Sequence, residues 1–367
     1  MQKKIRKIGG FVGQNRGNIR DCYSVTTVRG KKNLSGDFAA DNSGNISNSY
    51  AKMPLDALTG GLTGENTGQI ENSYFLHKKK ANSRSVTRLA DAKKGEQLKQ
   101  LKEEKNYANL GFDTDEIWEM GDSSIPLRFI PKNWNYAVPE EETEQLTEIR
   151  ISSTDDLLKF AQEVNKGDRN SQRAHVVLTE DLDLKGKEWI TIGINRFCAF
   201  EGIFDGGGHT IRNFTIKKKE TVLKGFFGCL KGQVYNLTVD CLIGNGSFCG
   251  GLAAQNEGVI GCCAAVLEIK DKSDMVGGLV GDNSGEIFQS YAAGHIITGI
   301  LLIPFFTPLA AIPVALLLGM SVWGLVGNII DNTDFRSTFA PVPYDEDQVP
   351  IQGEEIAPNT DGHFVSF

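Results

Sequence analysis

The sequence lacks the residue spacings that most metal sites and many catalytic sites require. Five histidines and seven cysteines occur, but no HExxH or CxxC motif is formed by them. No glycine-rich stretch carries the lysine of a phosphate-binding loop. We therefore predict no catalytic residue, no metal site and no cofactor. The cysteines are interpreted as buried, reduced thiols, because free cysteine behaves as a small apolar residue.

An excess of positive charge is also missing. The net charge is -7, and the segment 331–367 holds eight acidic residues against the single base Arg336, so residues 1–330 sum to zero. A neutral body argues against nucleic acid as a partner, since such proteins need a basic face. The basic start Met1–Lys7 is not followed by an apolar run, so no signal peptide is visible. The acidic, proline-containing segment 331–367 is predicted to be a disordered tail.

Two short clusters that contain aspartate are candidate sites. Asp181 and Asp183 alternate along a predicted strand and would face one side, as paired carboxylates for acid–base work or Ca²⁺ do. Asp205 and His209 flank three glycines. We interpret the first pair as a solvated face and the second as a turn between two strands.

The most informative feature that is present is a short repeat. Copies begin at residues 9, 36, 60, 224, 250 and 277, and their spacing within each block is 24–27 residues. The ninth position is glycine in all six copies, which indicates a positive φ or a close backbone approach. The third and eleventh positions are apolar, the seventh is asparagine in five copies, and the fifteenth is tyrosine in four.

This pattern predicts stacked coils and not helices, because no amphipathic helical period survives the glycines. We expect each coil to form three short strands, with equivalent residues about 4.8 Å apart on successive coils. The asparagines would then form a structural ladder. Near Ser153, a capping serine, an apolar helical face and Gly167 predict a helix that covers one end of the column.

The pattern GG(L/F)xGxNxGxIxxSY resembles the GLUG motif of bacterial surface proteins, including adhesin-like proteins and the non-catalytic part of IgA-specific metallopeptidases. The resemblance covers residues 9–75 and 151–293. It implies a right-handed β-solenoid and, in most known members, an extracellular location. It implies no protease activity, because the catalytic motif is absent.

The expected fold class is therefore all-β: a parallel, right-handed β-solenoid in two blocks, with short capping helices and a C-terminal transmembrane helix. The expected domains are a first block 1–75, a closing region 76–132, a linker 133–148, a second block 149–293, a transmembrane segment 296–330 and the tail 331–367. The first block starts without a cap, so its lower edge is expected to be bare. It would either belong to a longer ancestral protein or pair with another chain at that edge.

The segment 296–330 contains 35 consecutive uncharged residues, mostly apolar, and about 20 are enough to cross a bilayer. One kinked span is the first interpretation, and a hairpin of two short helices is the second. The location is expected to be membrane-associated at a bacterial cell surface, with a cytoplasmic-side location left open.

The expected function is that of a non-enzymatic, membrane-anchored or cell-surface repeat protein. It would present a solenoid face for adhesion or for binding a protein or glycan. One alternative is an effector that inserts residues 296–330 into a membrane. The other is a β-helix enzyme that acts on polysaccharides.

Overall fold

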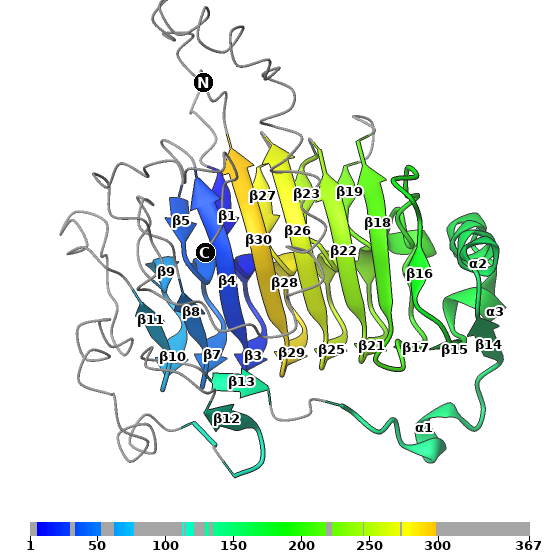
Figure 1. The fold of residues 1–367 in the computed structure, drawn as a ribbon, viewed down its shortest axis with the longest axis horizontal. Coiled ribbons are helices and arrows are strands. Elements are labelled where there is room, and N and C mark those ends of the chain that lie inside the picture. Colours follow the sequence, from blue (N-terminus) through cyan, green and yellow to red (C-terminus); the bar gives the residue numbers. More distant parts are fainter. Residues whose placement is uncertain are drawn as a thin grey trace, which may run out of the picture.

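The repeats build a column of parallel strands (Figure 1). The computed structural model describes residues 6–29, 34–52, 62–76, 112–113, 115–120, 129–131, 135–217, 222–244, 246–271 and 274–298. Five of the six repeat coils supply four short strands each in the described residues, one more than the three expected, and three strands are described for the coil that starts at Gly60. The extra strand arises at the glycine pair that opens the repeat, where the chain bends between β1 (Lys7–Gly9) and β2 (Val12–Asn15).

The strands at equivalent places in successive coils form four sheets, which we number in the order that a coil visits them. Sheet 1 contains, in spatial order, β19 (Leu223–Lys224), β23 (Phe248–Cys249), β27 (Met275–Gly277), β1 and β5 (Leu34–Gly36). Sheet 2 contains β20 (Phe227–Leu230), β24 (Ala253–Asn256), β28 (Val280–Asn283), β2, β6 (Ala39–Asn42) and β9 (Thr63–Asn66).

Sheet 3 is the longest. It contains β14 (Glu148–Ile151), β15 (His175–Leu178), β17 (Ile203–Asp205), β21 (Gln233–Tyr235), β25 (Val259–Gly261), β29 (Glu286–Phe288), β3 (Asn18–Arg20), β7 (Asn45–Ser47) and β10 (Gln69–Glu71). Sheet 4 contains β16 (Leu182–Asp183), β18 (Thr210–Ile216), β22 (Thr238–Ile243), β26 (Ala264–Asp271), β30 (Tyr291–Thr298), β4 (Tyr23–Arg29), β8 (Tyr50–Lys52) and β11 (Tyr74–Leu76).

The order of the sheets shows that the two expected blocks form one column. The first coil of the N-terminal block stacks on the last coil of the second block, with β1 beside β27 and β4 beside β30. The edge that was expected to be bare is therefore covered by residues 275–298 of the same chain (Figure 1). This happens because both coils carry the same repeat, so their backbone groups and inward side chains match rung by rung.

The repeat positions predicted to form the core do so. The third position is completely buried in all six coils, from Phe11 to Leu279, and the eleventh is at most 2% exposed. The invariant glycine is explained by close approach. A Cβ on Gly17 would lie 2.0 Å from the carbonyl oxygen of Gly285 on the next coil. Asn15 and its equivalents form the predicted ladder inside the column.

A sharp corner precedes the sheet 4 strand of each of the six repeat coils. The thirteenth repeat residue has a left-handed backbone with φ between 44° and 55° in all six coils: Asp21, Asn48, Asn72, Asn236, Cys262 and Gln289. Asparagine and aspartate tolerate this conformation better than other residues with a side chain. The corner turns the chain so that the fourteenth residue points inward, where Ser49 Oγ accepts a hydrogen bond from the backbone N–H of Cys22 at 3.1 Å.

Helix α2 (Thr154–Lys166) covers one end of the column, as predicted. Ser153 caps it by accepting a hydrogen bond from the Asp156 N–H, and Gly167 ends it with φ of 85°. Leu157, Phe160, Ala161 and Val164 are its buried residues. The other helices within the described ranges are short: α1 (Glu140–Thr143), α3 (Arg169–Gln172) and the 3-10 turn η4 (Arg196–Cys198).

Described residues between the two blocks pack against the column. Trp118, in the antiparallel pair β12 (Trp118–Met120) and β13 (Phe129–Pro131), is completely buried against the rings of Tyr23 and Tyr50. Farther along, Tyr136 stacks on Tyr235 with ring centroids 4.2 Å apart. The closing region and linker therefore contact both blocks.

The expected transmembrane segment begins inside the solenoid. Ile296, Ile297 and Thr298 belong to β30, and Ile296 is completely buried. In the described residues, no helix has both the length and the apolar character needed to cross a membrane. Residues 299–330, the tail 331–367 and most of the closing region lie outside the described part of the chain.

Candidate functional site

The outer face of sheet 2 carries a row of polar side chains that crosses the junction of the two blocks. The sixth repeat position places Gln255, Asp282, Gln14, Asp41 and Glu65 in register on five successive strands. We call these five residues the polar row. Neighbouring strands lie about 4.8 Å apart, so the row presents an amide or a carboxylate at each rung.

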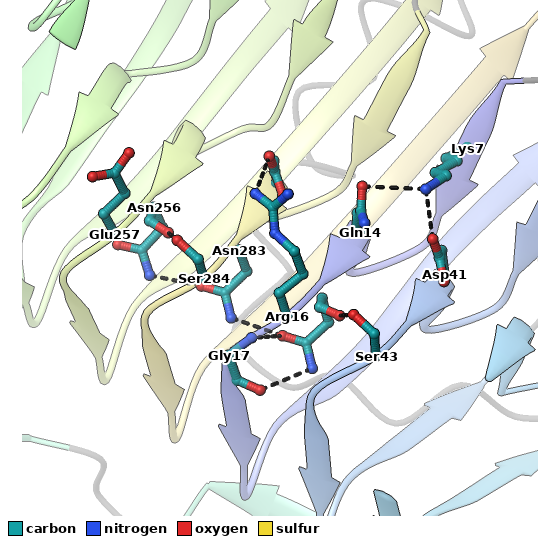
Figure 2. Close-up of polar contacts among 12 residues, drawn as sticks. Lys7, Gln14, Arg16, Gly17, Asp41, Ser43, Asn256, Glu257, Asn283 and Ser284 are labelled. Atoms are coloured by element: carbon teal, nitrogen blue, oxygen red, sulfur yellow. Dashed lines mark hydrogen bonds and ion pairs between the residues drawn. The ribbon is translucent and has the colours of Figure 1, made fainter. Parts of the chain in front are cut away.

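Two basic side chains from the first block lie over this row (Figure 2). Lys7, from sheet 1, donates to Gln14 Oε1 at 3.2 Å and forms an ion pair with Asp41. Arg16 Nη2 lies 2.7 Å from Asp282 Oδ2. Two cations therefore balance two of the three carboxylates, and hydrogen-bond donors and acceptors are interspersed along the row.

Asp282 is the most buried member of the row. Its side chain is 7% exposed, and its second oxygen, Oδ1, is buried without a hydrogen-bond partner among the described residues. Burial raises the pKa of Asp282, and the charges of Arg16 and Lys7 partly oppose this effect. The carboxylate is thus held between desolvation, which favours its neutral form, and the ion pair, which favours its charged form.

The asparagine ladder supports the row from inside. Each side-chain amide donates to the Oδ1 of the next, at 2.8 Å from Asn256 to Asn283, 2.9 Å to Asn15, 2.8 Å to Asn42 and 2.7 Å to Asn66. Asn15, Asn42, Asn256 and Asn283 are fully buried. The predicted ladder is confirmed. The ladder fixes the spacing of the polar row, which lies on the same strands.

The two candidate clusters form local turn contacts and contacts between coils. Asp181 Oδ1 accepts from the Thr210 N–H at 2.9 Å and lies 3.2 Å from His209 Nδ1. Asp183 instead accepts from the Lys185 N–H and from Asn213. The backbone N–H of Lys185, followed by Asn213, lowers the pKa of Asp183.

Asp181 and Asp183 are thus occupied by different contacts, and Asp181 lies just outside β16. Asp205 accepts from the Gly207 N–H at 2.9 Å, as a turn residue does. In the described ranges, no three of the His, Cys, Asp and Glu side chains are grouped so that they could hold a metal ion.

The cysteines lie at the sites expected for reduced thiols, with two exceptions in burial. All seven are free, and five are buried, whereas Cys198 and Cys262 are half-buried. Burial raises the pKa of Cys263 above its usual range. A buried thiol of this kind is a poor nucleophile, because the thiolate is the reactive form.

The polar row was missed from the sequence because its members come from two parts of the chain that are far apart in sequence. Arg16 and Asp282 are 266 residues apart. The available signal was that the sixth repeat position is polar or charged in five of the six copies. Comparison of the chain with family models, with curated proteins and with solved structures finds no match in any of the three.

Proposed function

We propose that this chain is a non-enzymatic, cell-surface β-solenoid that binds an extended glycan along the polar row. The observation that supports this is the in-register series from Gln255 to Glu65, which repeats hydrogen-bonding groups along one rigid face. Sugar hydroxyls both donate and accept, so they suit a face in which amides, carboxylates and cations are mixed. The resemblance to GLUG repeats, and the right-handed winding that it implies, belong to the same proposal.

The charge of the row favours a neutral glycan over a polyanion. Asp41 and Asp282 are each paired with one cation, and Glu65 is exposed. A polyanionic chain would meet an uncompensated carboxylate at this end. A protein ligand would require a larger complementary surface. No contact among the described residues indicates where such a surface lies.

A glycan array followed by calorimetry tests the proposal. Gln14→Ala removes the amide at the centre of the row, and Asn45→Ala removes an exposed amide on sheet 3 that bonds only to its neighbour Asn18. Loss of a hydrogen bond to a ligand costs about 1–3 kcal/mol, so Gln14→Ala should weaken binding about 10-fold or more. Asn45→Ala should leave it unchanged. Equal affinities for both variants would refute the row as the binding face.

A polysaccharide-active enzyme is the second candidate, and the carboxyl with a raised pKa at Asp282 favours it. Two rungs separate Asp282 from Asp41, which places them about 10 Å apart, near the upper limit for an inverting pair of carboxyls. However, each of these carboxyls already holds a cation, which opposes a role as a proton donor. Release of reducing ends from a bound glycan would decide for the enzyme.

Membrane attachment through the apolar segment is part of the proposal. With Ile296–Thr298 in β30, the uncharged stretch that follows is residues 299–330, or 32 residues, which is still longer than the 20 or so that a span requires. Cell fractionation of the full chain and of a chain ending at residue 298 should place only the full chain with membranes. Leakage of liposomes on addition of the full chain would favour the alternative of a membrane-inserting effector.

A further inference from the structure

The junction between the blocks is a stack that the backbone does not cross. β27–β30 of the last coil in the second block pair with β1–β4 of the first block on all four sheets. We call this interface the seam. The covalent link between the blocks runs through the residues that follow β11 and precede β14. Opening the seam therefore requires no change of connectivity within either block.

The contacts shared by all coils do not select this pairing. The ladder hydrogen bond across the seam, from Asn283 to Asn15, is 2.9 Å, against 2.7–2.8 Å for the ladder bonds within the blocks. Apolar residues meet in the same positions on both sides. Any coil of the repeat could stack on any other by these contacts alone.

Ion pairs such as Lys7–Asp41 join other coils too, but a particular set of charged contacts distinguishes the seam. Arg16 reaches across to Asp282 at 2.7 Å, and Arg20 Nε lies 3.4 Å from Glu286 Oε1. The Arg20 guanidinium also lies 4.5 Å from the centre of the Phe288 ring. Three contacts thus join one pair of arginines to one coil. Two of them are diagonal charge pairs, in which the acid lies two residues before the register partner of the arginine, and the third joins the register partners Arg20 and Phe288.

This combination occurs once among the six coils. Arginine stands at both the eighth and twelfth repeat positions only in the coil that starts at Gly9. Acidic residues stand at both the sixth and tenth positions only in the coil that starts at Gly277. Complementary charges at otherwise equivalent interfaces set partner choice, because mismatched pairs lose the attraction or repel.

We propose that the seam is a specific docking interface, and that the first block of a second copy of this chain fills it when the block of the same chain does not. The resulting dimer exchanges first blocks and contains two seams with the contacts described above. Each seam carries a complete polar row, with Gln14, Asp41 and Glu65 from one copy and Gln255 and Asp282 from the other. The closed monomer is favoured at low concentration, because its own block is tethered nearby.

Two full-length variants with opposite charge reversals test this inference, which does not depend on glycan binding. The first carries Arg16→Glu and Arg20→Glu, and the second carries Asp282→Lys and Glu286→Lys. Each variant alone brings like charges together at its own seam. In an exchanged pair, one seam has the native charges and the other has both pairs reversed, so both seams are complementary.

The two variants are co-expressed with different affinity tags, purified in tandem and weighed by native mass spectrometry. The expected result is a 1:1 complex with twice the mass of the 40.1 kDa chain, and at least 10-fold more co-purification than from two differently tagged wild-type chains. A single chain with all four substitutions is the matched control. It should be monomeric and as stable as the wild type, because its own seam is complementary again.

Three outcomes would overturn the inference. The variants co-purify no more than the wild-type chains do, the fourfold variant fails to fold, or the fourfold variant dimerises as much as the mixture. Failure of either double variant to fold alone does not affect the test, since the mixture and the fourfold variant are measured independently.

Discussion

Replacement of Asn42 by alanine tests whether the asparagine ladder stabilises the column. Asn42 is completely buried, accepts from Asn15 Nδ2 at 2.8 Å and donates to Asn66 Oδ1 at 2.7 Å. Its amide also donates to the backbone oxygen of Gly44 at 3.2 Å. Alanine at this position would interrupt the ladder on both sides of the second coil of the first block.

The expected loss follows from these contacts. Two ladder hydrogen bonds contribute about 1 kcal/mol each, and the Asn66 oxygen, left without its donor in a buried place, costs about 1–3 kcal/mol more. The free energy of unfolding should therefore fall by about 3–5 kcal/mol. A loss of this size is at the high end for a single substitution and is measurable by urea titration.

Asn45→Ala is the matched control, because Asn45 donates to Asn18 Oδ1 at 2.8 Å in the same way but is exposed. Water replaces the lost partner there, so the expected change is within about 0.5 kcal/mol. Similar losses for the two variants, or a loss below about 1 kcal/mol for Asn42→Ala, would show that the buried ladder does not stabilise the column as argued.

Three further predictions concern single residues. Cys262 has φ of 53°, and asparagine tolerates this backbone better, so Cys262→Asn should stabilise the protein by roughly 0.5–1 kcal/mol; a lower melting temperature would contradict this. Ser153→Ala removes the cap of α2 and should cost about 1 kcal/mol in denaturant titrations, whereas Ser153→Thr should cost less. Burial raises the pKa of Asp282, so the folded chain binds this proton more tightly than the unfolded chain, and its contribution to stability is lost as pH rises through the raised value. Asp282→Asn should remove this pH-dependent contribution to the free energy of unfolding. The stability of the wild type relative to the variant should therefore fall as pH rises above about 4, and a difference independent of pH would contradict the prediction.

The core of each coil was predictable because each position has one local cause. An apolar residue at the third or eleventh position must point inward in any stacked coil. Glycine is required at residue 17 because a Cβ there would lie 2.0 Å from the carbonyl oxygen of Gly285 on the neighbouring coil. The helix over the column end was predictable for the same reason. Its cap at Ser153, its apolar face and Gly167 all lie within one short segment.

The order of the coils was not predictable from the repeat pattern, because that pattern is the same on both sides of every interface. The order of the coils is specified by single charged residues, such as Arg20 and Glu286, and their pairing is visible only in the folded structure. The polar row was missed for the same reason, since Asp282 and Gln14 become neighbours only through the seam. The left-handed corner at the thirteenth position has a signal in the sequence, because an acid or amide stands there in five of six copies.

The place where the seam opens has a consequence for anything joined to the solenoid. Lys7 donates its backbone N–H to the carbonyl of Asp274, and Thr298 is the last residue of β30 on the same coil. In the preceding coil, only three residues separate the end of β26 at Asp271 from the start of β27 at Met275. A comparably short splice from Thr298 to Lys7 would make the whole backbone circular. Without that splice, a protein fused before residue 6 or after residue 298 would be attached along the length of the column and not at either of its ends.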